Sequence, residues 1–417
     1  MKALLFERSL PRFAASRIVS EFGSGRGARV TPLRLVDADP PDLPGEGWHR
    51  VAPVLSGICG SDLAMLDGRS SRYFEPLVSF PFVPGHEVVG TIEDAAIAAD
   101  GSPLAAGRRV VIQPVLGCAA RGIEPPCSSC AAGHTGDCEH VAFGHLSAGI
   151  QTGFCADTGG GWSTAGLVAH ESQLHAVPDD MSDADAVTVE PVACALHAVL
   201  GAGLRGDQVV AVLGAGTLGL ATVAALTHLS THGLVPVPRA LLVGARYANQ
   251  RRLATVLGAD SALSPDQLAR AVRRHSRSMT MGATSSGRLT GGADLVFDCV
   301  GSAESIGQSL AMVRPRGTVV LVGMPGRVTV DLASLWHREA RLLGAYAYGT
   351  ETVRDQDRST FSLAIETVAA MGTGRLVSAT YPLDRFEEAV AHAGAAGRRG
   401  AVKIAFDVVA SSKGGRR

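Results

Sequence analysis

The sequence has almost no net charge. Its 38 lysine and arginine residues nearly cancel 39 aspartate and glutamate residues, which leaves a formal net charge of −1 over 417 residues. A balanced chain has no general electrostatic attraction for nucleic acid or for an anionic membrane. We therefore expect no nucleic-acid partner and no membrane partner, and we expect a small molecule as the substrate.

Long apolar segments are also scarce. The apolar run near the N-terminus, residues 3–6, is too short for a signal peptide. One uncharged stretch, residues 209–226, is long enough to span a membrane, but Gly214, Gly216 and Gly219 interrupt it with the spacing of a dinucleotide-binding turn. A buried strand, a tight turn and a buried helix explain it better. We expect a cytoplasmic protein whose eight cysteines are reduced and serve metal binding or catalysis rather than disulfides.

Long helical periodicity is missing from the first 175 residues. Short β-prone runs such as 88–92 and 109–112, separated by Gly and Pro, predict a β-rich domain with many turns. From residue 176 apolar strands alternate with helices, which predicts a parallel sheet covered on both faces. A chain of 417 residues can form two cores. We expect an α/β protein with a β-rich domain (residues 1–175 and 345–417) and a doubly wound parallel-sheet domain (residues 176–344).

Four side chains in three separate motifs have the chemistry of catalytic zinc ligands. Cys59 begins a Cys-Gly-Ser-Asp motif, His86 and Glu87 belong to a Gly-His-Glu motif, and Glu190 precedes a proline. Thiolate, imidazole and carboxylate are the ligands of a catalytic zinc, which takes three protein ligands and leaves one position open. Each of these residues alone is more often a packed thiol or a hydrogen-bonded polar group. The two motifs that accompany them favour a metal site.

The first accompanying motif is a cluster of four cysteines within 21 residues. The run Cys127-x2-Cys130-x7-Cys138 has the spacing of a tetrahedral zinc lobe, and Gly133 gives it the freedom to fold back on the ion. Cys118, separated from Cys127 by eight residues, could complete the set. The alternative is that four free thiols lie close together in the sequence by chance. This would require half of the chain's eight cysteines to fall within 21 residues without a shared function. We expect a structural zinc here.

The second accompanying motif is a glycine-rich turn, Gly214-Ala215-Gly216-Thr217-Leu218-Gly219, between an apolar strand and a helix. This is the context that a dinucleotide-binding fingerprint requires, because its glycines let a pyrophosphate approach the helix N-terminus. The next strand ends in Ala245 and Arg246, where NAD-binding domains usually have an acidic residue. A guanidinium can bind a 2′-phosphate, so we expect NADP(H), with NAD(H) as the second choice. Alternatively, Arg246 is a solvated arginine at a strand end.

With these motifs in this order, the chain resembles the zinc-dependent medium-chain dehydrogenases and reductases, the family of alcohol and polyol dehydrogenases. The resemblance covers nearly the whole chain and extends to Asp298-Cys299-Val300-Gly301 and to the strand that ends at Gly323. It implies a GroES-like catalytic domain, a Rossmann domain and a homo-oligomer of two or four chains.

The resemblance also implies roles for single residues. Cys59 and His86 are expected to bind the catalytic zinc, with Glu87 and Glu190 as alternates for the third position. Asp62 is expected to orient His86, and Ser61 to pass the proton of the substrate hydroxyl outward. Zinc would polarise the substrate oxygen while a hydride moves to or from the nicotinamide. The residues expected at the cofactor are Gly214, Gly216, Thr217, Leu218, Gly219, Arg246, Val300 and Gly323.

Two positions depart from the family pattern. Ala64 stands where many alcohol dehydrogenases carry a relay histidine, and eight residues follow Cys118 where the family usually has two. The predicted function is hydride transfer between NADP(H) and a secondary alcohol, polyol or sugar-like substrate. The alternatives are an amino-alcohol or aminocyclitol dehydrogenase of a biosynthetic pathway and a catalytically silent NADPH-binding protein. The intact set of Cys59, His86 and Glu190 argues against the silent protein and against a zinc-free quinone reductase.

Overall fold

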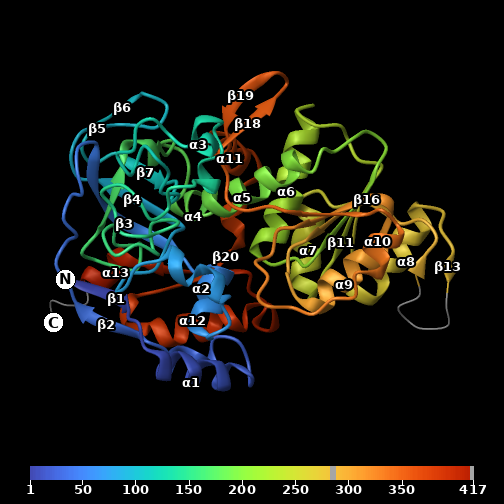
Figure 1. Cartoon of the computed structure of the whole chain (residues 1–417), viewed down its shortest axis with the longest axis horizontal. Helices are drawn as coiled ribbons and strands as arrows, with labels where there is room; N and C mark the ends of the chain where they lie inside the picture. Colours follow the sequence, from blue (N-terminus) through green and yellow to red (C-terminus); the bar gives the residue numbers. More distant parts are fainter. Residues whose placement is uncertain (282–287, 414–417) are drawn as a thin grey trace. The chain divides into compact units, whose positions relative to one another are not determined.

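The computed structural model describes residues 1–281 and 288–413, and the chain forms two compact units (Figure 1). The first unit contains Met1–Glu190, Tyr348–Thr350 and the C-terminal part from Ala364; the second contains Pro191–Ala347 and Glu351–Leu363. The sequence pattern predicts the first change of unit at residue 176. Residues 176–190 stay with the first unit in the structure, because Arg109 pairs with Asp183 at 2.8 Å and Thr188 hydrogen-bonds Thr373 at 2.6 Å.

A seven-stranded sheet lies at the centre of the first unit. Its strands are β3 (Trp48–Gly57), β4 (Val88–Ile92), β7 (Arg109–Ile112), β8 (Leu167–His170), β9 (Leu174–Ala176), β20 (Val377–Tyr381) and β21 (Lys403–Asp407). They are ordered β20-β21-β3-β4-β7-β9, with β8 beside β3. All neighbours are antiparallel except β20 and β21. Two small antiparallel pairs accompany the sheet: β1 (Lys2–Phe6) with β2 (Leu33–Asp37), and β5 (Ala96–Ile97) with β6 (Pro103–Leu104).

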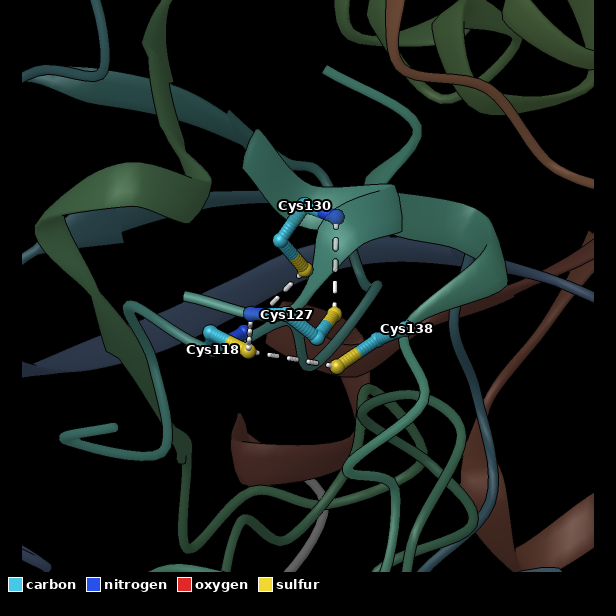
Figure 2. A group of neighbouring side chains, drawn as sticks. All are labelled: Cys118, Cys127, Cys130 and Cys138. Carbon is cyan, nitrogen blue, oxygen red and sulfur yellow. Dashed lines mark hydrogen bonds between the residues drawn. The ribbon is translucent and has the colours of Figure 1, made fainter. Parts of the chain in front are cut away.

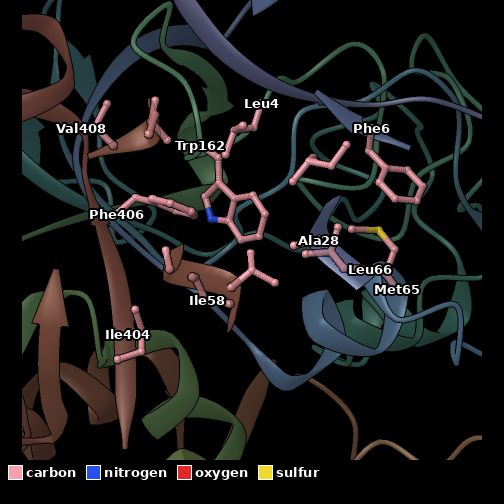
Figure 3. Packing of buried hydrophobic residues seen from close by; sticks show 14 of the residues in the cluster. Leu4, Phe6, Ala28, Ile58, Met65, Leu66, Trp162, Ile404, Phe406 and Val408 are labelled. Carbon is pink, nitrogen blue, oxygen red and sulfur yellow. The ribbon is translucent and has the colours of Figure 1, made fainter. Parts of the chain in front are cut away.

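Trp162 is the largest fully buried side chain in a hydrophobic core of the first unit (Figure 3). Its ring packs edge-on against Phe406 with 5.0 Å between centroids, and its Nε1 donates to the Gly57 carbonyl at 3.2 Å. Gly85 has a φ of +101°, and a Cβ there would lie 2.5 Å from the Trp162 ring. Only glycine fits that backbone. Trp162 therefore positions both the end of β3 and the residue that precedes His86.

Helix α1 (Leu10–Ser20) forms although the sequence indicates no long helical periodicity before residue 176. The side that it buries carries Ser16 and Ser20 instead of apolar side chains, so no apolar stripe marks it. The Ser20 hydroxyl donates to the carbonyls of Arg17 and Asp67, which ties the helix to its neighbour. The other helices that include residues of the first unit are α2 (Gly60–Leu66), α3 (Ser128–Ala131), α4 (Asp183–Ala186), α5 (Val189–Gly201), α11 (Thr360–Met371), α12 (Phe386–Gly394) and α13 (Val408–Lys413).

The second unit contains a six-stranded parallel sheet. Its strands are β10 (Val209–Leu213), β11 (Ala240–Gly244), β12 (Ser261–Leu263), β15 (Ala293–Asp298), β16 (Val313–Leu321) and β17 (Arg341–Gly344). The order β12-β11-β10-β15-β16-β17 reverses its direction between β10 and β15, which confirms the predicted doubly wound sheet. Ligands bind such sheets at the carboxyl ends of the strands beside this switch point. The helices are α6 (Thr217–Thr231), α7 (Ala248–Val256), α8 (Pro265–His275), α9 (Ala303–Met312) and α10 (Ala333–His337).

Two short antiparallel pairs of strands are also present. One is the hairpin of β18 (Thr350–Val353) with β19 (Gln356–Ser359); the other pairs β13 (Thr280–Met281) with β14 (Arg288–Leu289). The residues between β13 and β14, 282–287, fall outside the described part of the chain. In residues 1–281 and 288–413, helices long and apolar enough to cross a membrane are absent. The uncharged stretch 209–226 is β10, a turn and the beginning of α6.

Candidate active site and cysteine centre

Three potential metal ligands converge in the first unit. The Cys59 thiol, a ring nitrogen of His86 and a Glu87 carboxylate oxygen lie within 4.8 Å of one another. Cys59 precedes the first residue of α2, while His86 and Glu87 lie directly before β4. Because β3 and β4 are antiparallel neighbours, the end of one strand and the beginning of the next meet at the same edge of the sheet. Two motifs that are 27 residues apart are thereby brought together.

Asp62 links the two sides of this group. It is fully buried in the first turn of α2, and its Oδ2 accepts a hydrogen bond from the Cys59 amide at 2.9 Å. Its Oδ1 lies 3.6 Å from His86 Nδ1, and both atoms are buried without a hydrogen-bond partner in the described structure. A slight rotation would pair them. The imidazole would then have one nitrogen held by a carboxylate and the other free for a metal.

The charges around His86 favour its protonation while no metal is bound. Burial by itself disfavours the imidazolium, but Asp62, Cys59 and Glu190 outweigh this effect and raise the pKa of His86 well above its ordinary value. Burial raises the pKa of Asp62. A divalent cation would replace the proton as the positive charge in this pocket. The donor set of thiolate, imidazole and carboxylate therefore fits a zinc ion.

Glu87 has a partner that the sequence pattern did not identify. Lys403 of β21 forms a buried ion pair with the Glu87 carboxylate, and both side chains are almost fully buried. Burial lowers the pKa of Lys403, but the negative charges of Glu87 and Cys59 outweigh this and raise it. Gly57 leaves room for the pair, since a Cβ there would collide with both side chains. The available sequence signal was Lys403 itself, a charged residue at the start of the apolar run Ile404-Ala405-Phe406 in the final strand.

Glu190 lies apart from the three converging ligands. Within residues 1–281 and 288–413, the group found within 4.8 Å contains Cys59, His86 and Glu87 but not Glu190. Glu190 is nevertheless close enough for its charge to act on His86, and burial raises the pKa of its own carboxyl group. The Tyr348 hydroxyl, itself buried, donates to Glu190 Oε1 at 3.1 Å. Sequence reasoning missed Tyr348, because nothing local marks a tyrosine 158 residues away as a partner.

Ser61 and Ala64 lie on α2 beside this group. Ser61 is half-buried and occupies the first turn of the helix, next to Asp62. Ala64 lies one turn further on and has no proton to transfer. A hydroxyl at Ser61 can exchange a proton with a neighbouring oxygen, whereas the next turn of the helix cannot continue such a relay.

The four cysteines of the predicted lobe form a second compact group (Figure 2). Their sulfur atoms lie within 4.8 Å of one another, with Cys118 Sγ and Cys138 Sγ 3.7 Å apart. Backbone amides point at the sulfurs: Cys127 N lies 3.3 Å from Cys118 Sγ, and Cys118 N lies 3.5 Å from Cys130 Sγ. Although burial opposes ionisation, hydrogen bonds from the amides of Cys130 and Glu139 lower the pKa of Cys127 to about 7. Four convergent thiols with amide donors fit a tetrahedral zinc.

The eight residues between Cys118 and Cys127 form a compact loop. The amides of Arg121 and Ile123 both donate to the Cys118 carbonyl, at 3.1 and 3.0 Å. These turns return the chain to the cluster, so the unusual spacing leaves Cys118 beside the other three sulfurs.

The glycine-rich turn lies at the carboxyl end of β10 in the second unit. Gly214 has a φ of +91°, and a Cβ there would lie 2.5 Å from the Val300 side chain. Gly219 leaves no room for a Cβ beside the Gly214 carbonyl, whereas a Cβ at Gly216 would meet open space. The open side at Gly216 is where a pyrophosphate can approach the start of α6, which begins with Thr217 and Leu218.

Val300 and Gly323 meet beside this turn. Asp298 Oδ1 accepts hydrogen bonds from the amides of Val300 and Gly301 at 2.9 and 3.0 Å, which fixes the turn after β15. A Cβ at Gly323 would lie 2.6 Å from the Val300 backbone. The structure thus brings Gly214, Val300 and Gly323 together at the ends of three neighbouring strands.

Arg246 is exposed at the end of β11, directly after buried Ala245. Arg251 of α7 folds back and donates from Nη1 to the carbonyls of Ala245 and Arg246, at 2.9 and 3.0 Å. Two arginines therefore lie at the strand end where an adenosine ribose binds in this type of sheet.

Comparison with known proteins agrees with this architecture. Residues 45–179 match the alcohol dehydrogenase GroES-like domain, and residues 242–370 match the zinc-binding dehydrogenase family. The chain is 30% identical to a sorbitol dehydrogenase of Arabidopsis thaliana over 310 residues, which cover 73% of this chain and 76% of that protein. It is 28% identical to an L-idonate 5-dehydrogenase of Vitis vinifera, over 80% of this chain and 81% of that one.

Solved structures show the same fold. A putative zinc-binding dehydrogenase from Sinorhizobium meliloti 1021, bound to NADP, superimposes with a TM-score of 0.65 at 25% identity, covering 90% of this chain and 95% of that chain. Galactitol-1-phosphate dehydrogenase from Escherichia coli superimposes with a TM-score of 0.67 at 18% identity, covering 98% of this chain and all of that one.

The fold and both matched domains define an oxidoreductase that acts on CH–OH groups with zinc and a nicotinamide dinucleotide as cofactors. The chain belongs to the zinc-dependent medium-chain alcohol and polyol dehydrogenases. The resemblance inferred from its motifs is thereby confirmed. Its substrate is a small molecule.

Proposed function

We propose that the protein transfers a hydride between NADP(H) and a secondary hydroxyl or carbonyl group of a polyol or sugar-like substrate, with NAD(H) as the second choice of cofactor. The convergence of Cys59, His86 and Glu87 carries this proposal, since the three donors suit a zinc ion that keeps one position open. Relatives named for sorbitol and idonate support the substrate class. Arg246 and the absence of an acid beside it support NADP(H).

Each residue of the site has a role in this proposal. Cys59 and His86 would hold the zinc together with Glu87, the carboxylate nearest to them, and Glu190 would remain the alternate ligand. A zinc ion held there supplies a Lewis acid for the substrate oxygen. Asp62 fixes the orientation of the His86 ring. Ser61 takes the proton of the substrate hydroxyl and passes it to solvent, because Ala64 offers no further relay.

The proposal for the second metal is a structural zinc bound by Cys118, Cys127, Cys130 and Cys138. Four thiolates close the coordination sphere and leave no position for a substrate. Both centres need reduced cysteines, which supports the proposed cytoplasmic location.

We also propose a homo-oligomer in which β17 pairs with β17 of a second copy. In the described part of the chain, β17 pairs with β16 alone and ends the parallel sheet. All four of its residues are exposed, including Leu342 and Leu343. An exposed apolar edge strand presents unpaired backbone groups and is a template for pairing with another chain.

Zinc content tests the function directly. We expect two zinc ions per chain in the wild type and one in Cys59→Ser, measured by plasma mass spectrometry after removal of loosely bound metal. Glu87→Gln and Glu190→Gln separate the two candidate carboxylates, because only the true ligand should lower the zinc content or the retention of zinc. Polyol oxidation with NADP+ should disappear in Cys59→Ser. Equal zinc content in the wild type and Cys59→Ser would refute the catalytic site.

A further inference from the structure

Arg121 is a buried cation beside the cysteine centre. It lies in the loop between Cys118 and Cys127, and no part of it is exposed to solvent. An arginine remains ionised in proteins, and a buried charge is costly unless other groups compensate it.

The guanidinium of Arg121 donates hydrogen bonds to backbone carbonyls on both sides of the lobe. Its acceptors are the carbonyls of Leu116 at 3.1 Å, Phe143 at 3.0 Å, Leu146 at 3.3 Å, Ser147 at 3.3 Å and Gly149 at 2.6 Å. In the part of the chain that the structure describes, no carboxylate is among these acceptors. The hydrogen bonds hold the loop 143–149 against the lobe, but they leave the positive charge without a direct counter-ion.

Arg121 lies next to Cys118 in the fold. Its amide donates to the Cys118 carbonyl at 3.1 Å, and its Nε donates to the carbonyl of Leu116, two residues before Cys118, at 3.1 Å. The cysteine centre to which Cys118 belongs is therefore the site beside this buried cation. Four thiolates around a divalent cation carry two excess negative charges. A fixed cation nearby offsets that excess where the dielectric constant is low.

The loop that Arg121 holds leads towards His86. Ile150 and Gln151 follow the loop, and the Phe154 amide donates to the Gln151 carbonyl at 3.1 Å. The Phe154 ring lies 5.7 Å from the His86 ring, measured between centroids. The cysteine lobe and the candidate active site are therefore joined through one continuous segment that Arg121 anchors.

We propose that Arg121 is a positioning residue whose positive charge retains the metal of the cysteine centre. The inference depends on the proposed function, in which Cys118, Cys127, Cys130 and Cys138 hold zinc. In this inference, the loop between Cys118 and Cys127 places the compensating cation in the interior beside the thiolates.

The test measures zinc release, in addition to stability, in protein that carries Cys59→Ser and so has only the cysteine centre. Arg121→Met removes the positive charge. Arg121→Lys keeps the charge but loses the planar guanidinium and its fixed set of N–H donors. We expect Arg121→Met to transfer zinc to a chromogenic chelator about tenfold faster than the parent, and Arg121→Lys to stay within about threefold of it. Arg121→Gln replaces Arg121→Met if the latter does not fold, with the same expectation.

Arg338→Met is the matched control. Arg338 is also a buried arginine that donates to a backbone carbonyl, at 3.5 Å for Thr290, but it lies in the second unit. The Arg338→Met variant should have a lower melting temperature than its parent and should release zinc at the same rate. Equal rates for Arg121→Met and the parent, or equally fast release from Arg121→Lys and Arg121→Met, would overturn the inference. A Cys59→Ser protein without zinc would instead refute the cysteine centre itself, before any Arg121 variant is compared.

Discussion

The buried ion pair of Lys403 and Glu87 places a full positive charge in contact with the carboxylate of a candidate zinc ligand. Such a pair is costly to break from one side, because the remaining charge is left buried without a partner. The pair gives Glu87 a counter-charge whether or not a metal is bound. Lys403 should therefore matter most for the metal-free protein.

For Lys403→Met we expect a loss of about 3 kcal/mol in the free energy of unfolding of the zinc-free protein. The loss should be smaller with zinc bound, because the metal then compensates Glu87. Urea unfolding with and without a chelator measures both values. Lys2→Met is the control: it breaks a solvent-exposed pair with Asp37 and should not shift the midpoint. Equal losses with and without zinc would show that the metal does not compensate Glu87.

Arg246 determines the choice of cofactor in the proposed function. Arg246→Ala should raise the dissociation constant of NADPH by about tenfold, since a charge-assisted hydrogen bond to the 2′-phosphate is lost. The constant for NADH should not change. Fluorescence titration measures both, and Arg252→Ala, an exposed arginine of α7, is the control. An unchanged ratio of the two constants would mean that Arg246 is only a solvated strand-end arginine.

His175 makes the stability of the first unit depend on pH. Burial lowers the pKa of His175 to about 4 from an ordinary value of 6.5, and its Nε2 lies 3.1 Å from Gln113 Oε1. Between these two values the unfolded chain binds a proton that the folded chain does not. The contribution is fully present above the unfolded pKa and is lost as the pH falls towards 4.

The wild type should therefore lose about 3 kcal/mol more than His175→Gln between about pH 7 and about pH 4. Urea unfolding at each pH, with the variant as reference, isolates this residue from the other titrating groups. Parallel losses in the two proteins would contradict a neutral buried His175.

At the level of elements, the local sequence pattern was enough to predict the parallel sheet but not the β18–β19 hairpin. Strands β10, β11 and β15 are short apolar runs between turns, which is why the sequence predicted a parallel sheet. The β18–β19 hairpin is polar, and its turn residues Arg354 and Asp355 have φ of 51° and 60°. A sequence without glycine or asparagine at those positions gives no sign of such a turn. Arg354 secures the hairpin by donating to the Gly233 carbonyl at 2.7 Å.

Strand β17 is the element on which the proposed oligomer depends. Leu343→Lys should place a charge on the exposed edge and raise the dissociation constant of the oligomer by about tenfold. Light scattering over a range of concentrations measures this, while circular dichroism shows whether the fold is retained. Val256→Lys, at an exposed residue of α7, is the control and should leave the mass of the oligomer unchanged. A wild-type monomer at all concentrations would rule out the proposed pairing.

At the level of the whole molecule, the chain is organised as two units with different chemistry. The first unit contains the two groups of metal donors, and the second contains the glycine-rich turn and Arg246. The order of the motifs predicted this organisation, because each is a short segment with a fixed spacing. The positions at which the chain changes unit were harder to predict, since residues 176–190 are held in the first unit by side-chain contacts that leave no periodic pattern in the sequence.

The sequence by itself determined the family, because the motifs that identify it are local. The same motifs supplied the candidate donors Cys59, His86, Glu87 and Glu190, the four cysteines and the glycine-rich turn, and left Glu87 and Glu190 as alternates. Only the tertiary structure decided which side chains from distant parts of the chain contact these residues. Lys403 reaches Glu87 from 316 residues away, and Tyr348 reaches Glu190 from 158. Lys403 meets Glu87 because the C-terminal strand β21 pairs with β3, the neighbour of β4. Local periodicity records which face of an element is buried, and it contains no information about the distant side chain that will meet it there.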